Sequence, residues 1–495
     1  MRRTLAAAAA LAVAAVTALT SVQASATSHS PKIEARLVAQ QAEQLGAFVV
    51  FDHKATHADV DRLQRLGVVK LHRFDIVPVI AVVTDLGALD EAARWPDVVA
   101  IRSNDPVRLE TNKSKQATKV DQVRAPRPKG LGLTGKGVAV AIIDSGADAT
   151  HQDFTGRLKT LLNFEGAWIY DNPQDGRFTD RLATGTGQLA GVDEHGHGSH
   201  VGGTIAGTGQ SALTDTDYTG MAPGADLVIA KIAGTHQGSL YDFGYEINCL
   251  IAMEYLVEHP ELKVRVINNS WSVYEVDDPG TEPVVMMANA LVDRGISLVF
   301  AAGNSGPGDG TVSWPGAAGK VITVAATKKT APFAVSGFSS RGYQVDIAAP
   351  GQDIMSVRGK TQLSTGPEDL LLSVPDAGLD APFYMAISGT SMAAPHITGI
   401  IALMLQANPK LTPQVVEEVL ERTSVDLGEP GKDHQYGYGF VDALRASKVA
   451  LCLKGKGNRE ACFTAVRALP KAKWASDYAD AGDKSKTEQG SDLPL

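Results

Sequence analysis

Two kinds of hydrophobic pattern alternate along the central part of the chain. Short continuous apolar runs predict strands that are buried on both faces of a sheet. These runs are 138–144, 227–232, 264–268, 297–301 and 321–325. Segments 245–257 and 282–294 predict covering helices, and 391–406 is apolar on nearly every side, as a buried central helix would be. The alternation predicts an α/β fold with a doubly wound, mostly parallel sheet.

The part of the chain before residue 119 has a pattern of its own. It predicts strand 48–51, helix 58–66, two strands within 68–84, helix 86–94 and strand 98–101. This β-α-β-β-α-β order is that of a ferredoxin-like α+β domain. The polar stretch from Glu110 to Gln122 lacks periodicity, and we interpret it as a linker between two domains.

Three segments carry candidate catalytic side chains. Asp144 ends an apolar strand, where open α/β sheets place their functional groups. His197 lies between two glycines, and Ser391 begins the central helix, where the helix N-terminus favours negative charge. Taken singly, the aspartate and the serine could be ordinary caps, and the histidine a satisfied polar group.

Together, Ile-Ile-Asp144-Ser-Gly, Gly-His197-Gly-Ser-His-Val-Gly-Gly-Thr and Gly-Thr-Ser391-Met-Ala-Ala-Pro resemble the motifs of the subtilisin-like serine peptidases, or subtilases. The chain order Asp, His, Ser is that of subtilisin. The resemblance covers about residues 120–450. It implies a subtilisin-like fold with Ser391 as nucleophile, His197 as general base and Asp144 as the group that orients the imidazole.

The resemblance extends to the oxyanion site and to the substrate-binding walls. Asn304 matches the family's oxyanion asparagine. The matching substrate-binding residues are Ser270, Trp271, Ser272, Gly238, Ser239, Ala302 and Gly303, and most relatives carry glycine in place of Ser272. These walls and the expected pocket base, 313–315, carry no charged side chain. We therefore expect a broad or apolar preference at P1.

The N-terminal domain, residues 27–118, resembles the inhibitory propeptides of subtilases, which assist folding, block the cleft and are removed by self-cleavage. A permanently attached domain is the alternative. The basic start, the apolar stretch 5–22 and Ala24-Ser25-Ala26 predict a signal peptide over 1–26, and hence secretion. The peptidase domain is expected over 119–450, followed by a partly disordered extension, 451–495.

Composition limits the partners. A net charge of −9 on 495 residues, without a basic run, argues against nucleic acid. No segment after the signal peptide is apolar over the roughly 18 residues of a membrane span. We expect protein or peptide substrates, the propeptide as inhibitor, and a monomer. Cys452 and Cys462 are close in sequence and are expected to form a disulfide, whereas Cys249 is expected to be a buried thiol.

The predicted chemistry requires no cofactor, but a structural calcium ion is possible. Asp153, nine residues after Asp144, matches a position that binds calcium in many relatives. A calcium site needs six or more oxygen ligands. The loop that should supply the others, 208–219, departs from the family pattern, leaving Asp215 and Asp217 as substitutes.

Two other functions stay open at this point. His195, His197 and His200 resemble the His-x-His-x-Asp-His zinc run of metallo-β-lactamase-type hydrolases, although Ser199 replaces the aspartate. A catalytically silent subtilase-fold binding protein is the other possibility. The segment 363–383 is longer than the corresponding connection in subtilases, and we interpret it as a surface loop.

Overall fold

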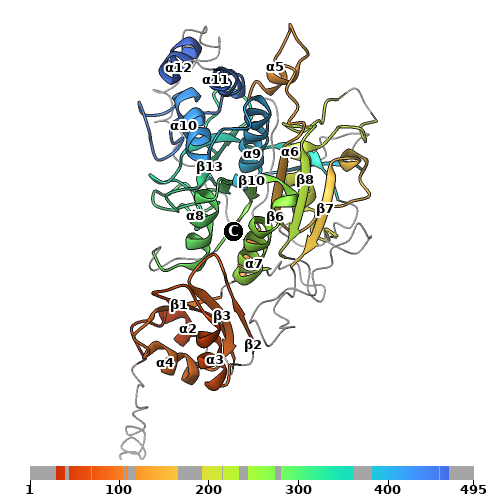
Figure 1. Cartoon of the computed structure of the whole chain (residues 1–495). Helices are drawn as coiled ribbons and strands as arrows, with labels where there is room; N and C mark the ends of the chain where they lie inside the picture. The colour runs from red at the N-terminus through yellow and green to blue at the C-terminus, as the bar shows by residue number, and fades with distance from the viewer. Residues whose placement is uncertain are drawn as a thin grey trace, which may run out of the picture.

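The computed structural model describes residues 29–39, 44–68, 70–104, 106–109, 117–164, 192–213, 216–233, 244–273, 280–359, 382–455 and 458–467. The predicted signal peptide, nearly all of 363–383 and the residues after Arg467 lie outside these ranges. Figure 1 shows a small N-terminal domain below a larger α/β domain.

The N-terminal domain has the predicted ferredoxin-like order. Its elements are α2 Ala35–Ala39, β1 Leu45–Phe51, α3 His57–Arg65, β2 Lys70–Arg73, β3 Val79–Thr84, α4 Leu86–Ala93 and β4 Val98–Ser103. The strands form an antiparallel sheet in the order β2-β3-β1-β4. Helix α3 begins where Thr56 and Asp59 form a capping box.

Both faces of this small sheet are apolar. Successive residues of a strand point to opposite faces, and in β1 both sets are hydrophobic. Val49 and Phe51 of β1 pack into the core beneath the domain's own helices. Phe48 and Val50 belong instead to a core shared with the larger domain, which includes Leu250 and Met287. The N-terminal domain therefore completes its packing only against the rest of the chain.

The larger domain contains a seven-stranded parallel sheet in the order β14-β13-β12-β10-β6-β8-β7. Its strands are β6 Ala139–Asp144, β7 Leu158–Asn163, β8 Asp226–Lys231, β10 Val264–Asn269, β12 Ser297–Ala301, β13 Ile322–Lys328 and β14 Ile347–Gln352. Strand order reverses between β6 and β10, so the carboxyl ends of these strands form the switch point at which α/β sheets place their sites.

Helices cover both faces of the sheet, as the doubly wound prediction requires (Figure 1). They are α5 Val120–Arg124, α6 His197–Ala206, α7 Glu246–Glu258, α8 Pro283–Asp293, α9 Thr390–Ala407, α10 Pro413–Thr423, α11 Ala443–Lys454 and α12 Arg459–Arg467. Val140 and Ile142 of β6 pack on the side of α6 and α9. Ala141 and Ile143 pack on the side of α7 and α8. Every residue of α9 except Gln406 is buried, in agreement with its uniform apolarity.

Short elements complete the described chain. They are β5 Pro106–Leu109, β9 Gly244–Tyr245, β11 Trp271–Ser272, β15 Ile354–Val357, β16 Tyr384–Ile387, and the 3₁₀ helices η1 Gln152–Phe154 and η2 Pro260–Leu262. Two small sheets result, β11-β5-β9 and β15-β16.

Two sequence-based boundaries fall within packed elements of the structure. The predicted linker ran to Gln122, but Ala117 and Thr118 are already buried and α5 begins at Val120. Val120 and Val123, three residues apart, provide the apolar contact that holds this short helix. At the other end, α11 continues past residue 450 to Lys454, and the Cys452–Cys462 disulfide joins it to α12. Residues 451–455 and 458–467 therefore pack with the larger domain.

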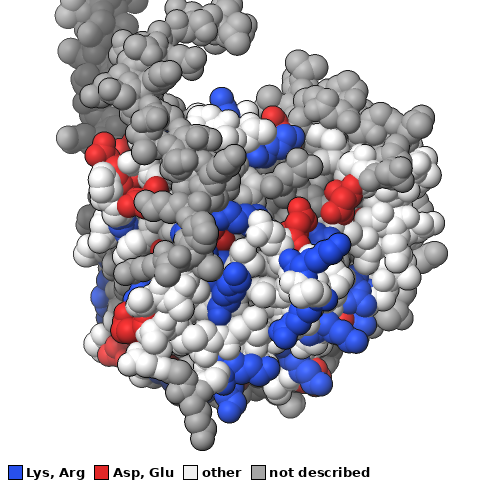
Figure 2. All heavy atoms as spheres, turned by 90° about the horizontal axis from the view of Figure 1, so that it is seen from above, with Lys and Arg blue, Asp and Glu red and all other residues white. Residues whose placement is uncertain are grey.

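Surface charge is uneven. Figure 2 shows the end that is uppermost in Figure 1, where Lys and Arg side chains gather on one side with a few acidic residues among them. The net charge of −9 is thus not spread evenly over the molecule. Among the described residues, no helix combines the length and the apolarity that a membrane crossing requires.

Candidate active site

Asp144 and His197 form a buried hydrogen-bonded pair at the switch point. Nδ1 of His197 lies 2.7 Å from Oδ1 of Asp144, and both side chains are inaccessible to solvent. The contact depends on glycine, since a Cβ at Gly198 would lie 2.2 Å from the carbonyl oxygen of Gly146. With Nδ1–H donated to the carboxylate, Nε2 is the nitrogen available for proton transfer.

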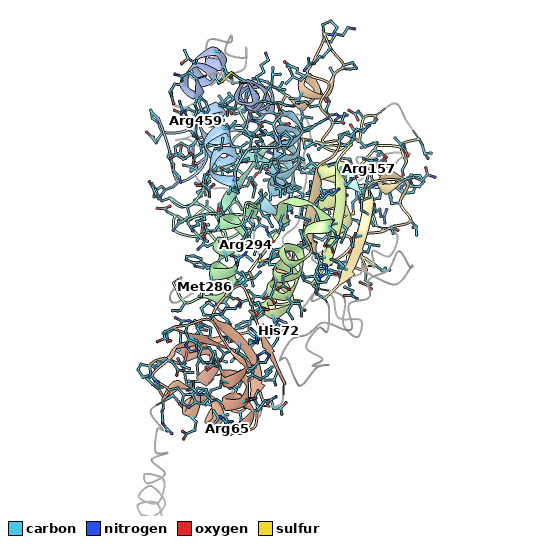
Figure 3. All side chains as sticks on the ribbon, viewed as in Figure 1. Arg65, His72, Arg157, Met286, Arg294 and Arg459 are labelled. Carbon is cyan, nitrogen blue, oxygen red and sulfur yellow. A yellow bond between two sulfur atoms is a disulfide. The ribbon has the colours of Figure 1, made fainter. Side chains whose placement is uncertain are left out.

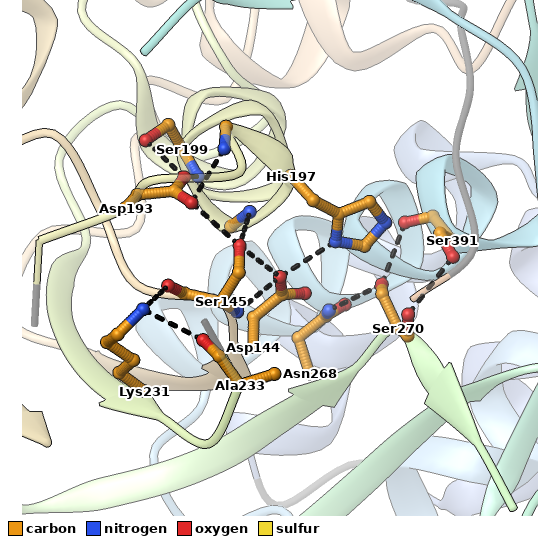
Figure 4. Close-up of polar contacts among 12 residues, drawn as sticks. Asp144, Ser145, Asp193, His197, Ser199, Lys231, Ala233, Asn268, Ser270 and Ser391 are labelled. Atoms are coloured by element: carbon orange, nitrogen blue, oxygen red, sulfur yellow. Dashed lines mark hydrogen bonds and ion pairs between the residues drawn. The ribbon is translucent and has the colours of Figure 1, made fainter. Parts of the chain in front are cut away.

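Ser391 lies in the first turn of α9, beside the end of β10 (Figure 4). Its hydroxyl donates to the carbonyl oxygen of Ser270 at 3.1 Å, and the Ser270 hydroxyl donates to the Ser391 carbonyl at 2.8 Å. Asn268 Nδ2 donates in turn to the Ser270 hydroxyl at 2.9 Å. Proton transfer to His197 requires the Ser391 hydroxyl to exchange its bond to Ser270, and catalytic hydrogen bonds commonly tighten only with substrate.

Asn304 is held by the residue next to the serine. Its Oδ1 accepts from the backbone N–H and the hydroxyl of Thr390 at 2.9 and 3.0 Å. The Thr390 hydroxyl also accepts from the N–H of Gly303 at 3.0 Å. Because the amide oxygen accepts from Thr390, the orientation of the amide is set and its nitrogen, the donor of this group, faces the other way. Apart from the position of Thr390 next to Ser391, no sequence pattern predicts this role.

The predicted pocket walls lie against one another. Ser313 donates its N–H to the Ala302 carbonyl at 2.8 Å, and Val273 donates to the Trp314 carbonyl at 2.8 Å. Gly303 has φ +102, and a Cβ there would lie 2.1 Å from the Ser313 hydroxyl. Glycine is therefore required where these two segments meet. Gly238 and Ser239, the predicted opposite rim, lie outside the described residues.

A strand of the chain itself lies on the predicted substrate-binding segment. Within β11, Trp271 pairs antiparallel with Leu109, and Ser272 pairs with Arg108. The other edge of β5 pairs with β9, through Pro106 opposite Tyr245. Residues just after the N-terminal domain thus occupy the place of an extended peptide between two edge strands. Pairing between such distant segments has no local sequence signal.

The zinc interpretation of the three histidines is wrong. His197 uses Nδ1 for Asp144, whereas Nε2 of His200 lies 3.0 Å from the carbonyl oxygen of Ile354. Burial lowers the pKa of His200 to about 3, so this imidazole is neutral. Among the described residues, the groups of three ligating side chains within 4.8 Å of one another do not include His195, His197 or His200.

The surroundings of Asp153 do not fit calcium. Its carboxylate accepts backbone N–H groups from Gly209 and Ser211, both at 2.9 Å. Both oxygens also lie 3.0 Å from the Tyr384 hydroxyl. Asp217 accepts instead from Thr219 at 2.9 Å, and Asp215 lies outside the described residues. Two N–H groups and the single Tyr384 hydroxyl proton thus take up most of the roughly four acceptor positions of this carboxylate, so a calcium ion on Asp153 would have to displace Tyr384.

A cluster of carboxylates lies away from the triad. Asp346, Glu417 and Glu421 bring their oxygens within 4.8 Å of one another. Lys432 donates to Asp346 at 3.0 Å, which supplies one positive charge to the group. Burial and the nearby Asp346 raise the pKa of Glu417 and of Glu421 to about 7.

The fold and this arrangement define a serine hydrolase built on a parallel α/β sheet. A buried Asp–His pair ends β6 and begins α6, and a serine begins the central helix beside an oriented asparagine.

The comparisons with known proteins specify the family. The model of the "Subtilase family" matches residues 135–439. "Serine protease AprX" of Bacillus subtilis (strain 168) is 32% identical over 341 residues, which are 66% of this chain and 70% of the relative. "Subtilisin Savinase" of Lederbergia lenta is 30% identical over 331 residues, 66% of this chain and 97% of the relative. The chain therefore belongs to the subtilase family, and it is a serine endopeptidase.

A solved structure shows the same fold. Fervidolysin from Fervidobacterium pennivorans, described as a keratinolytic enzyme related to subtilisin, aligns with a TM-score of 0.60 at 22% identity. The alignment covers 83% of this chain and 61% of that chain.

Proposed function

We propose that this protein is a secreted serine endopeptidase that matures by cutting off its own N-terminal domain and then hydrolyses proteins with a broad or apolar P1 preference. The observation that carries the proposal is the buried 2.7 Å hydrogen bond between Asp144 and His197, with Ser391 at the start of the adjoining α9. A catalytically silent binding protein would not need this pair to be buried and aligned.

The mechanism follows from these groups. Ser391 attacks the scissile carbonyl while Nε2 of His197 takes its proton and later gives it to the leaving amine. Asp144 holds the imidazole through Nδ1 and stabilises the imidazolium that forms. Asn304 and the N–H of Ser391 donate to the oxyanion of the tetrahedral intermediate. Water then hydrolyses the acyl-enzyme by the same steps. The chemistry uses no metal or cofactor group.

Contacts between the two domains support an inhibitory role for the N-terminal domain. Glu254 of α7 accepts from the backbone N–H of Asp75 at 2.6 Å, and Nε2 of His72 lies 3.2 Å from its other oxygen. Asn104 accepts from the N–H of Ile247, at the start of α7, at 3.0 Å. Figure 3 shows His72 at this junction. These contacts support the interpretation of the domain as an inhibitory propeptide that blocks the substrate edge with β5.

The described flanks limit the position of the cut. Leu109 is paired with Trp271, and Ala117 is buried in a cluster with Phe333 and Phe440 of the larger domain. Beyond Ala117, the Thr118 carbonyl accepts from the N–H of Ala443. We therefore expect cleavage within residues 110–116, after which the new N-terminus stays docked from residue 117 onward.

Intact mass and N-terminal sequencing of the secreted wild type beside Ser391→Ala test the proposal. We expect the wild type to begin within 111–117 and Ser391→Ala to keep residues 27–109. If both variants mature alike, another protease makes the cut and self-processing is wrong. If neither matures and the wild type hydrolyses no peptide, the domain is permanent and the binding-protein alternative is favoured.

Specificity is tested separately, by the peptides released from a denatured protein. The described pocket walls carry no charged side chain, so fragments should follow apolar or mixed P1 residues. Cleavage confined to Arg or Lys at P1 would contradict this expectation.

A further inference from the structure

A second buried carboxylate lies behind the Asp144–His197 pair (Figure 4). Asp193, in the turn before α6, is fully buried. Its Oδ1 accepts from the Ser145 hydroxyl at 2.8 Å and from the Gly196 N–H at 2.7 Å. Its Oδ2 accepts from the N–H and the hydroxyl of Ser199 at 2.7 and 2.6 Å. The carboxylate thus receives four hydrogen bonds.

Asp193 is ionised at neutral pH. Burial by itself would raise its pKa, but the hydrogen bonds from Ser199 and Gly196 and the nearby His195 outweigh burial and lower it. The structure therefore holds a second negative charge next to Asp144, linked to it through one residue.

The linking residue, Ser145, has one hydroxyl proton and two possible acceptors. Its Oγ lies 2.8 Å from Oδ1 of Asp193 and 3.3 Å from Oδ1 of Asp144. Oγ also accepts the N–H of Gly198 at 2.9 Å, next to His197. Because Asp193 is the nearer carboxylate, it takes the proton, and Ser145 turns a lone pair toward Asp144.

We propose that Asp193 is a positioning residue of the catalytic site, which acts by holding the Ser145 hydroxyl proton away from Asp144. Among the described residues, Asp144 Oδ1 then accepts from Nδ1 of His197 and from the N–H of Ser145, both at 2.7 Å. Its Oδ2 accepts no hydrogen bond from the described residues. The inference rests on the proposed role of His197 as general base.

The consequence is a more basic partner for the imidazole. Each hydrogen bond to a carboxylate stabilises its charge and weakens its attraction for another donor. Without the charge of Asp193, the Ser145 hydroxyl would donate to Asp144, and the imidazolium that forms during catalysis would lose part of its stabilisation. Asp193 also anchors the first turn of α6 through Gly196 and Ser199. A purely structural role would therefore lower stability without changing the basicity of His197.

The test is the pH dependence of kcat/KM for Asp193→Asn, Ser145→Ala and the double variant. The acid limb of this profile reports the pKa of the general base in the free enzyme, which is His197 here. A neutral amide is a weaker acceptor than Asp144, so Asp193→Asn should move the acid limb down by about half a unit and lower kcat about tenfold. KM should stay within about twofold. In the Ser145→Ala background the same substitution should leave the limb in place.

Two further variants keep the inference testable if Asp193→Asn does not fold. Ser145→Ala alone should leave the acid limb unmoved, since its hydroxyl does not donate to Asp144; an upward shift would overturn the inference. Ser199→Ala, which removes one anchor of Asp193, should lower stability without moving the limb.

If Asp193→Asn shifted the acid limb equally in the wild-type and Ser145→Ala backgrounds, Asp193 would act on His197 through its charge alone. The proposed action through the Ser145 hydroxyl would then be overturned. An unmoved limb would reduce Asp193 to a structural anchor. A wild type without peptidase activity would refute the proposed function instead.

Discussion

The Tyr384 hydroxyl lies 3.0 Å from both carboxylate oxygens of Asp153, so it faces the two oxygens together. The Tyr384 ring stacks on Tyr218, with ring centroids 3.9 Å apart, which fixes the hydroxyl in place. Asp153 thus accepts hydrogen bonds from three donors, the Tyr384 hydroxyl and the N–H groups of Gly209 and Ser211. These bonds join β16 to the loop after α6.

We predict that Asp153 contributes equally to stability with and without calcium. Melting temperatures of Ser391→Ala, which prevents self-digestion, and of Ser391→Ala/Asp153→Asn are measured in EDTA and in millimolar calcium. Their difference should be the same in both. Tyr384→Phe should cost about 1–3 kcal/mol, because it leaves a buried carboxylate with fewer partners. The exposed Tyr343→Phe is the control. A difference that grows with calcium would place the ion on Asp153.

The second prediction concerns the oxyanion donor. Asn304→Ala should lower kcat by about 10²–10³ with KM nearly unchanged, because the donor acts on the transition state. Thr390→Val removes one of the bonds that orient the Asn304 amide and should lower kcat about tenfold, the equivalent of one hydrogen bond. Thr390→Ser keeps the hydroxyl and should restore most of the rate. If Thr390→Val matched wild type, the amide would be oriented by other groups.

The third prediction concerns the junction of the two domains. Glu254 is buried at this contact and receives two donors from the N-terminal domain. Its replacement by Ala leaves the Asp75 N–H without its acceptor and should cost the interface about 1–3 kcal/mol. The cleaved N-terminal domain should then separate from the enzyme earlier, so that peptidase activity appears sooner after processing.

Glu258→Ala, one turn further along α7 and exposed, is the matched control. Co-purification of the cleaved domain, followed by mass spectrometry, measures the effect. Equal retention in both variants would mean that the apolar core alone holds the domains together.

The fourth prediction concerns the pH dependence of stability. Burial raises the pKa of Glu417 from 4.5 to about 7 in the folded chain. Below pH 4.5 the carboxyl is protonated in both states, and its stabilising effect is complete. As pH rises to 7, the unfolded chain loses its proton first, so stability falls.

Glu417→Gln should therefore raise the melting temperature of the Ser391→Ala chain at pH 8 by about 1–2 °C, a value kept small by solvent screening, and should have no effect at pH 4.5. Glu421→Gln should behave alike, and the exposed Glu429→Gln should change neither value. A lower melting temperature of Glu417→Gln at pH 8 would show that the ionised form is the stabilising one.

Sequence patterns predicted the buried strands well, because a strand covered on both faces must be apolar throughout. The run 138–144 became β6 Ala139–Asp144, and 297–301 became β12 with the same bounds. Two strands of the same sheet were missed. In β7, Lys159 is exposed at the sheet edge, and in β14, Pro350 and Gly351 interrupt the pattern.

Sequence analysis predicted the site residues that belong to recognisable motifs and missed those that do not. Asp144 and His197 belong to recognisable motifs, and the structure brings them together. Asp193 was not singled out, because a charged residue before a glycine-rich turn is typical of exposed loops. Its burial depends on donors from Ser145 and Ser199, which only the folded chain places around it. Likewise, nothing local predicts that β5 pairs with β11, since strand pairing across more than a hundred residues is decided by tertiary packing.

The two-faced sheet of the N-terminal domain has a consequence for the fate of that domain. Phe48, Val50 and Phe74 belong to a core that is shared with the larger domain, so separation exposes an apolar surface on a sheet of only four strands. Such a fragment unfolds easily, and an unfolded chain is what an endopeptidase digests best. If the N-terminal domain is the inhibitory propeptide that we propose, each released copy becomes a substrate of the peptidase. Activation by this route is then irreversible, because the inhibitor is destroyed and cannot bind again.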